Sequence, residues 1–467
     1  MKQRWGAMML IAVLSFVCGG WLVRREPSAD GDVYQRARLF EDVLTTIQKH
    51  YVDTTSETEL YRQATQQLIT SLRDPYAELL VGDAYRQYRE QIAGTRRQSD
   101  SETGRGRGIG PTTGVLLSPG EVRVPAVGVA TLLDHGIGYV ALRTVSRSAS
   151  AEVAEAIEAL RASGMKRLVL DLRFNPGGLI SEGTAVADLF LDRGDTIATT
   201  RGRTAEHSRV YIDRSMQRWP DLPVVVLVNR GTASAAELIT TALQDHDRAA
   251  VIGMNSYGKG VVQTTFRLGD DVALKLTTAR WYGPSGRSIQ RPLPAGLAEW
   301  APLLVPGETP GAALGRFRSS AGRPLPASAG IVPDLIVRQT PLTEDERQFV
   351  GVAAADPAML HRILADCARD LKSRQRPATE AFVVTAEMRA AVRTQLERDG
   401  VHIAEPIFSA ATAYVDQTIG YAVAREVFGE AAETRRRARD DRQLTTAESL
   451  LIHARTAGDP IALAATR

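Results

Sequence analysis

A serine and a lysine, each among small residues in two neighbouring stretches, could together carry out nucleophilic catalysis. Ser234 lies in GTASAAE (231–237) and Lys259 in YGKGVVQ (257–263). A serine hydroxyl becomes a nucleophile when a base takes its proton, and a lysine amine can be that base only when it is neutral. We therefore expect burial to lower the pKa of Lys259 from about 10.4 to roughly 7 to 8. Gln263 could accept a hydrogen bond from the amine and orient it without adding charge.

Each of these residues also fits a role outside catalysis. Ser234 and Glu237 form the Ser-x-x-Glu pattern of a helix capping box. Lys259 could be a solvated loop lysine, and Gln263 an ordinary strand residue. Lys259 also nearly completes a phosphate-binding P-loop, but Gly260 stands where that motif needs Ser or Thr, and the β-branched residues that follow favour a strand over a helix. A nucleotide-binding P-loop is therefore disfavoured.

Both stretches lie in residues 124–340, where β-branched runs alternate with helical periodicity. The order β-α-β-α-β predicts right-handed crossovers and a largely parallel, buried sheet. The expected strands are 166–173, 223–229 and 249–253, and the expected helices are 179–191 and 234–244. The turns from strand into helix lie at one end of such a sheet, so residues 175–178 (NPGG) and Ser234 are expected at the same end.

Both turns could contribute backbone groups to a site, and the helix start at Ser234 is suited to a developing oxyanion. The two glycines of NPGG allow backbone N–H groups to point into a site. The helix that begins at Ser234 offers free N–H groups and about half a positive charge at its N-terminus. Small neighbours around Ser234 leave room for a substrate backbone beside its hydroxyl.

Different patterns mark the flanks of this α/β region. Residues 33–93 and 342–467 repeat apolar residues at spacings of three and four, which predicts an N-terminal helical region and an all-helical C-terminal region. Residues 94–123 have the Gly, Ser, Arg and Pro content of a linker, and residues 293–329 predict a long surface loop.

Residues 1–25 resemble an export signal. The uncharged run 5–23 follows two basic residues and approaches the roughly 20 residues that span a bilayer. We expect a single N-terminal transmembrane signal anchor, with a removed signal peptide as the alternative. In either case the bulk of the chain is expected in the cell envelope, on the periplasmic or extracytoplasmic side.

Composition narrows the class of protein. The chain of 467 residues is 44% hydrophobic, enough for two or three folded units. Lys and Arg number 57 against 54 Asp and Glu, so a net charge of +3 provides no general attraction to nucleic acid. Cys18 lies in the apolar N-terminal run, so a disulfide with Cys367 is not expected. The seven histidines include no H-E-x-x-H motif, and we predict no metal or cofactor.

A histidine base is the competing catalytic arrangement. A helix separates His246 from Ser234 by about 18 Å, which makes it a poor partner. His135 could approach Ser234, but nothing near it in the sequence marks it as a base.

Taken together, these motifs resemble those of the C-terminal processing peptidases, also called tail-specific proteases. LDLRFNPGG, GTASAAE and GKGVVQ occur in order, within a resemblance that covers most of residues 33–340. The resemblance implies an α/β, crotonase-like (ClpP/crotonase-type) catalytic core with helical flanks. It also implies that Ser234 is the nucleophile, Lys259 the general base and Gln263 the residue that orients the lysine.

The resemblance further implies an oxyanion hole made of backbone N–H groups. These would come from Ala235 and from the glycine pair, from Gly178 in preference to Gly177. Ser-Lys chemistry of this kind needs no metal or cofactor.

One departure from the family concerns substrate capture. Family members usually carry a PDZ domain before the catalytic core, which binds the free C-terminus of the substrate by strand addition. The matching interval here, residues 94–123, is too short for such a domain. We therefore expect a peptidase that is either constitutively open or dependent on an adaptor or activator protein.

The remaining expectations concern partners. Substrates would be unfolded or tail-exposed proteins or peptides, the N-terminal segment would contact the membrane, and residues 342–467 would mediate homo-oligomer formation or an adaptor contact. The alternative from a different class is a catalytically silent exported scaffold that keeps the peptidase fold for binding.

Overall fold

The computed structural model describes residues 29–97, 121–292, 313–327, 329–353, 357–374 and 376–466. The chain divides into two compact units, residues 1–77 and 78–467. The described part of the first unit consists of helices α2 (Ala29–His50) and α3 (Glu57–Thr70). No helix in these described ranges is both long and apolar enough to cross a bilayer. The anchor predicted for residues 1–25 lies outside them.

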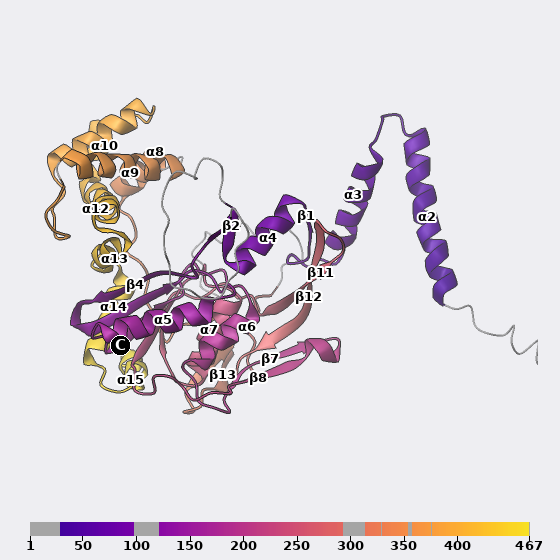
Figure 1. The fold of residues 1–467 in the computed structure, drawn as a ribbon, viewed down its shortest axis with the longest axis horizontal. Coiled ribbons are helices and arrows are strands. Elements are labelled where there is room, and N and C mark those ends of the chain that lie inside the picture. Colours follow the sequence, from indigo (N-terminus) through magenta and orange to yellow (C-terminus); the bar gives the residue numbers. More distant parts are fainter. Residues whose placement is uncertain are drawn as a thin grey trace, which may run out of the picture. The chain divides into compact units, whose positions relative to one another are not determined.

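A six-stranded sheet forms the centre of the second unit (Figure 1). Its order is β15-β10-β9-β6-β5-β4, and all neighbours are parallel except the antiparallel pair β4–β5. The strands are β4 (Val127–Leu133), β5 (Ile137–Leu142), β6 (Arg167–Asp171), β9 (Val224–Val228), β10 (Ala250–Gly253) and β15 (Leu335–Ile336). The prediction of a largely parallel sheet is confirmed, because β6, β9 and β10 fall inside the three expected strands.

Helices cover both faces of this sheet, and alternate residues of each strand point to opposite faces. On β6, Leu168 and Leu170 pack into one apolar cluster while Val169 packs into another. The first cluster includes residues of α5 (Ala149–Ala162), α6 (Ile180–Asp188) and α7 (Ala235–Asp245). Burial on both faces explains why the strands are continuous apolar runs.

The second face is covered by the C-terminal end of the chain. Leu444, Ala447, Leu450 and Leu451 pack against alternate residues of β6, β9 and β10. The covering helices are α13 (Glu430–Ala438), α14 (Arg442–His453) and α15 (Asp459–Ala465). Residues predicted as a separate helical region thus complete the core, and each buried leucine contributes about 1.5–3 kcal/mol through the surface it removes from water.

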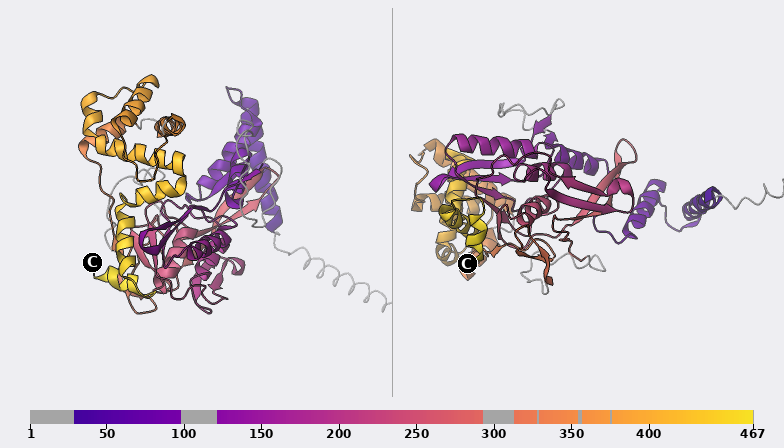
Figure 2. Two further views of the ribbon diagram at one scale, coloured as in Figure 1. Left: turned by 60° about the vertical axis from the view of Figure 1, so that its left-hand side comes forward. Right: turned by 90° about the horizontal axis from the view of Figure 1, so that it is seen from below.

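The rest of the predicted C-terminal helical region has an apolar cluster of its own. This cluster joins α8 (Glu344–Ala353), α9 (Pro357–Arg374), α10 (Ala386–Arg398), α11 (Glu405–Ala410) and α12 (Thr412–Phe428). Figures 1 and 2 show α13 and α14 between these helices and the sheet. The described residues after 342 contain helices and no strand.

A second, antiparallel sheet corrects the prediction for residues 33–93. Its order is β1-β12-β7-β8, with β11 also paired to β12. The strands are β1 (Glu78–Val81), β7 (Thr196–Gly202), β8 (Arg209–Ile212), β11 (Val261–Arg267) and β12 (Val272–Tyr282). Residues 78–81 were predicted to be helical, but they form a strand because β12 provides a pairing edge that the local sequence does not reveal. Helix α4 (Asp83–Ala93) follows.

Two strand pairs occur where linkers were predicted. In the interval 94–123, β2 (Thr95–Arg97) pairs with β3 (Glu121–Arg123), and the residues between them lie outside the described ranges. In the predicted loop 293–329, β13 (Ala313–Arg318) pairs with β14 (Pro324–Ala327).

Candidate active site

Ser234 occupies an unusual backbone conformation at the start of α7. Its φ is 55° and its ψ is −119°, in a region that non-glycine residues rarely adopt. The turn before it is held by two hydrogen bonds: the Thr232 hydroxyl donates to the Leu172 carbonyl at 2.8 Å, and the Ala233 N–H donates to the Asn175 carbonyl at 2.9 Å. Such a conformation costs about 1–3 kcal/mol and persists only where its surroundings impose it, as at functional sites.

Glu237, one turn into α7, joins the serine turn to the lysine loop. Its carboxylate is fully buried and accepts four hydrogen bonds. Oxygen Oε2 accepts the backbone N–H groups of Ser234 at 2.8 Å and Lys259 at 2.9 Å. Oε1 accepts the Ser256 hydroxyl at 2.5 Å and the Gly258 N–H at 2.6 Å. The backbone N–H groups of Ser234 and Lys259 therefore donate to the same oxygen atom, Oε2 of Glu237.

Burial raises the pKa of Glu237, and its four hydrogen-bond donors act in the opposite direction. The Ser-x-x-Glu pattern predicted only a capping-box role for Glu237. Its link to the loop at Ser256–Lys259 was missed because a local pattern reports only contacts along one helix. The available signal was a carboxylate in the first turn of a helix, between small residues (Ala235, Ala236) and apolar ones (Leu238, Ile239).

Lys259 contacts Gln263, as predicted. The lysine Nζ donates to the Gln263 Oε1 at 2.7 Å, and both side chains are half-buried. The contact forms because β11 begins only at Val261 and its pairing register shifts between Val262 and Gln263. In a straight strand the two side chains would lie too far apart for this hydrogen bond. The turn before β11 and the register shift bring them closer together.

The two glycines of NPGG have different backbone roles. The Gly177 N–H donates to the Asn175 side chain at 2.9 Å, so this N–H group is not available to a substrate. Gly178 forms a parallel bridge with Val145, in which the flanking Leu179 N–H donates to the Val145 carbonyl at 2.9 Å. This pattern directs the Gly178 N–H away from Val145.

The glycine turn packs directly against the serine turn. A Cβ placed on Gly177 would lie 2.8 Å from the Ser234 Cβ and 2.8 Å from the Ala235 nitrogen, so only glycine fits there. Within the described part of the chain, the N–H groups of Gly178 and Ala235 have no acceptor. These are the two donors predicted for an oxyanion hole.

The histidine alternative is not supported. His246 caps the opposite end of α7 from Ser234, and its ring nitrogens contact the Thr196 carbonyl at 2.8 Å and the Ser320 hydroxyl at 3.2 Å. His135 lies in the turn between β4 and β5 with a φ of 60°.

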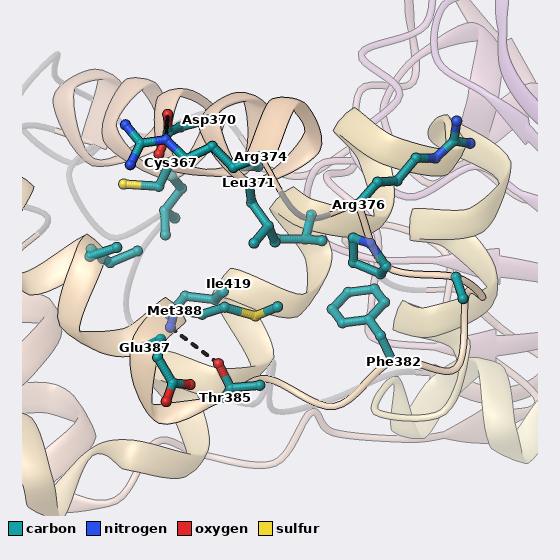
Figure 3. A pocket seen from close by; sticks show the side chains of 17 residues that line it. Cys367, Asp370, Leu371, Arg374, Arg376, Phe382, Thr385, Glu387, Met388 and Ile419 are labelled. Carbon is teal, nitrogen blue, oxygen red and sulfur yellow. Dashed lines mark hydrogen bonds and ion pairs between the residues drawn. The ribbon is translucent and has the colours of Figure 1, made fainter.

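A cavity of about 760 Å³ lies elsewhere, among the C-terminal helices (Figure 3). Residues of α9, α10 and α12 line it, including Leu371, Met388 and Ile419, and Phe382 comes from the loop before α10. None of the predicted site residues contributes to it, so this cavity is separate from the candidate active site.

Comparison with known proteins gives a family for the part of the chain that holds this site. Residues 136–297 match the sequence profile of peptidase family S41. A carboxy-terminal-processing protease of Bartonella bacilliformis is 38% identical over 216 residues, which cover 43% of this chain and 49% of that protein. The matched part thus spans about half the length of that relative.

Two further proteins are similar to this chain. A probable CtpA-like serine protease of Staphylococcus epidermidis is 24% identical over 346 residues, covering 61% of this chain and 69% of that protein. A solved photosystem II D1 C-terminal processing protease aligns at 23% identity with a TM-score of 0.35, covering 54% of this chain and 89% of its own. Ser234, Lys259 and Gln263 all lie within the residues 136–297 that match the profile of peptidase family S41.

Proposed function

We propose that this protein is an exported serine endopeptidase of the C-terminal processing type, which uses a Ser-Lys dyad in a crotonase-like core. One observation carries the proposal: the backbones of Ser234 and Lys259 are bound to the same buried carboxylate oxygen of Glu237. The membership of residues 136–297 in a peptidase family supports it.

In this proposal Ser234 is the nucleophile and neutral Lys259 is the general base. The lysine takes the hydroxyl proton as the serine oxygen bonds to the substrate carbonyl carbon. The carbonyl oxygen becomes negatively charged beside the N–H groups of Gly178 and Ala235. The peptide C–N bond then breaks as the lysine gives the proton to the leaving amine. The same lysine next deprotonates a water that bonds to the acyl carbon, and it returns this proton to the Ser234 oxygen as the acyl C–O bond breaks.

The surroundings are suited to these roles. Gln263 accepts one proton of the lysine amine at 2.7 Å without adding a charge that would keep the amine protonated. The backbone conformation of Ser234 is imposed by hydrogen bonds to Leu172 and Asn175, so the serine is positioned before substrate arrives.

Substrates and location are part of the same proposal. We assign unfolded or tail-exposed proteins as substrates, since relatives are named as carboxy-terminal-processing proteases. Residues 1–25 would act as an anchor or signal that places the peptidase outside the cytoplasm. An adaptor or activator protein, or a second copy of the chain, would supply the control that a PDZ domain supplies in other family members.

Casein degradation by the purified protein tests the chemistry. Ser234→Ala and Lys259→Ala are each expected to reduce the rate by about a thousandfold or more, because nucleophile and base act as a unit. Ser163→Ala, at the exposed end of α5, is the matched control and should keep wild-type activity. An active wild type with undiminished activity in either site variant would refute the dyad. No hydrolysis by the wild type, alone or with envelope extract, would favour the silent scaffold.

A further inference from the structure

A buried ionic cluster connects the C-terminal helices to the turn that carries the glycine pair. Arg173, just after β6, donates through Nη2 to Asp171 Oδ2 at 2.7 Å and through Nε to the same carboxylate at 3.0 and 3.1 Å. Its Nη1 lies 2.7 Å from Asp441 Oδ2, in the residue that caps α14, and donates to Gln443 Oε1 at 3.0 Å. The guanidinium is thus held from two sides by segments far apart in sequence.

Little solvent reaches this cluster. The Arg173 side chain is 10% exposed, that of Asp171 is 2% exposed and that of Asp441 is 18% exposed. Burial raises the pKa of Asp171, but the charge and hydrogen bonds of Arg173, together with the Tyr139 hydroxyl that donates to Oδ2 at 2.6 Å, hold that pKa below its usual value. A charge pair in such a site is costly to break, because the remaining partner stays buried without its counter-charge.

Arg173 stands directly before the turn whose N–H groups matter for the proposed reaction. Two residues later, the fully buried Asn175 donates to the Leu142 carbonyl at 2.8 Å and accepts the Gly177 N–H at 2.9 Å. Gly178 follows. Between them, the Phe174 N–H donates to the Asn229 side chain at 3.0 Å, so a shift of Arg173 would act on the Gly178 N–H through a short, hydrogen-bonded segment.

We propose that Asp441 is a positioning residue for the peptidase site: by holding Arg173, it keeps the turn 174–178 in the geometry that directs the Gly178 N–H at the oxyanion. This inference rests on the proposed Ser-Lys function. It gives the C-terminal helices a part in positioning the site, since Asp441 at the start of α14 would help to align the turn that follows the C-terminal end of β6.

The variant Asp441→Asn separates this role from helix capping. Asp441 Oδ1 accepts the N–H groups of Gln443 and Leu444 at 3.0 and 3.2 Å, and asparagine caps helices about as well as aspartate. The side-chain amide that replaces Oδ2 cannot accept from a guanidinium. Asp440→Asn is the matched control, because it removes the same charge one position earlier, where the carboxylate accepts the Tyr421 hydroxyl at 2.8 Å.

Two measurements on the full-length protein test the proposal. Hydrogen exchange followed by mass spectrometry should show faster exchange in the segment 172–179 of Asp441→Asn than in Asp440→Asn, with exchange in α14 unchanged. In peptide hydrolysis, Asp441→Asn should lower kcat by about tenfold to a hundredfold and leave KM within about twofold, as expected for a misplaced transition-state donor.

The outcomes are separable. Unchanged exchange in segment 172–179 would overturn the positioning role whether or not the wild type hydrolyses peptides. An active wild type whose kcat does not respond to Asp441→Asn would overturn it as well. A wild type that hydrolyses nothing would count against the proposed function alone, and the exchange experiment would still decide whether Asp441 holds the turn.

Discussion

At the scale of single residues, the partner of the Lys259 amine controls whether that amine can act as a base. The Gln263 Oε1 accepts it at 2.7 Å and contributes no charge. A carboxylate in the same place would keep the hydrogen bond but would favour the protonated amine. Lys259 needs to be neutral in the proposed mechanism, so glutamine is a better partner for it than glutamate.

The variant Gln263→Glu tests this reasoning. The added carboxylate should raise the pKa of Lys259, so the ascending limb of the pH–rate profile should move to higher pH by about one unit or more. Gln263→Leu is the control, since it removes the hydrogen bond without adding charge and should lower kcat without an alkaline shift. Superimposable pH profiles for wild type and Gln263→Glu would show that Lys259 is not the base.

At the scale of elements, the beginning of helix α7 organises the site through Glu237. Its carboxylate accepts hydrogen bonds from four donors that belong to two segments of the chain. An ionised carboxylate has acceptor positions for all of them, whereas a glutamine has one acceptor oxygen and presents two N–H groups instead. Beside these four bonds, the Tyr257 N–H donates to the Thr232 carbonyl at 2.9 Å, so the packing of the serine turn against the lysine loop depends mainly on the Glu237 side chain.

Glu237→Gln should consequently be costly. Buried donors would be left without acceptors, and we expect the free energy of unfolding to fall by at least about 2 kcal/mol, with loss of peptidase activity. Urea denaturation monitored by circular dichroism gives the first quantity. Thr240→Val is the matched control, because Thr240 is equally buried on α7 and its hydroxyl donates to the Ala236 carbonyl of its own helix, at 2.9 Å. Equal stability of the two variants would contradict the role assigned to Glu237.

At the scale of the whole molecule, the central α/β core and the C-terminal helices share one folded structure. Leu444, Leu450 and Leu451 of α14 are buried against the central sheet. Deleting residues 342–467 would expose that sheet face, so such a deletion cannot report on oligomerisation alone. Variants on α8–α12, which have their own apolar cluster, leave the sheet covered and suit that question better.

A half-buried carboxyl group on α14 predicts that the stability of the protein depends on pH. Burial, together with the nearby carboxylates of Asp134 and Asp441, raises the pKa of Glu448 on α14 to about 7. A group whose pKa is raised in the folded state contributes stability that is complete below its unfolded pKa, near 4.5, and is lost as pH rises through about 7. Stability should therefore decline from pH 5 to pH 8.

Glu448→Gln should remove this part of the decline. After allowance for solvent screening, we expect the Glu448 carboxyl to lower the free energy of unfolding of the wild type by about 1 kcal/mol between pH 5 and pH 8. Melting temperatures across this range measure it, with Glu155→Gln at an exposed position of α5 as control. Parallel melting curves for wild type and Glu448→Gln would show that the carboxylate is not responsible.

Local sequence was sufficient for the features that depend on neighbouring residues. The alternation of apolar runs predicted β6, α6, β9, α7 and β10 in the correct order, because burial on one or both faces leaves a periodic pattern. The motifs NPGG, GTASAAE and GKGVVQ marked the turns at one end of the sheet, since glycine and small residues are needed where backbones approach closely.

Only the tertiary structure decided the features that depend on contacts between distant segments. It placed residues 78–81 in a sheet with β12, gave Glu237 its contacts to the Lys259 loop, and packed α14 on the central strands. It also supplied a physical reason for the expected preference of Gly178 over Gly177, because the Asn175 side chain accepts the Gly177 N–H. Periodicity records which face of an element is buried but not which partner buries it, and this is why pairing, packing and hydrogen-bond choice could not be inferred from the chain alone.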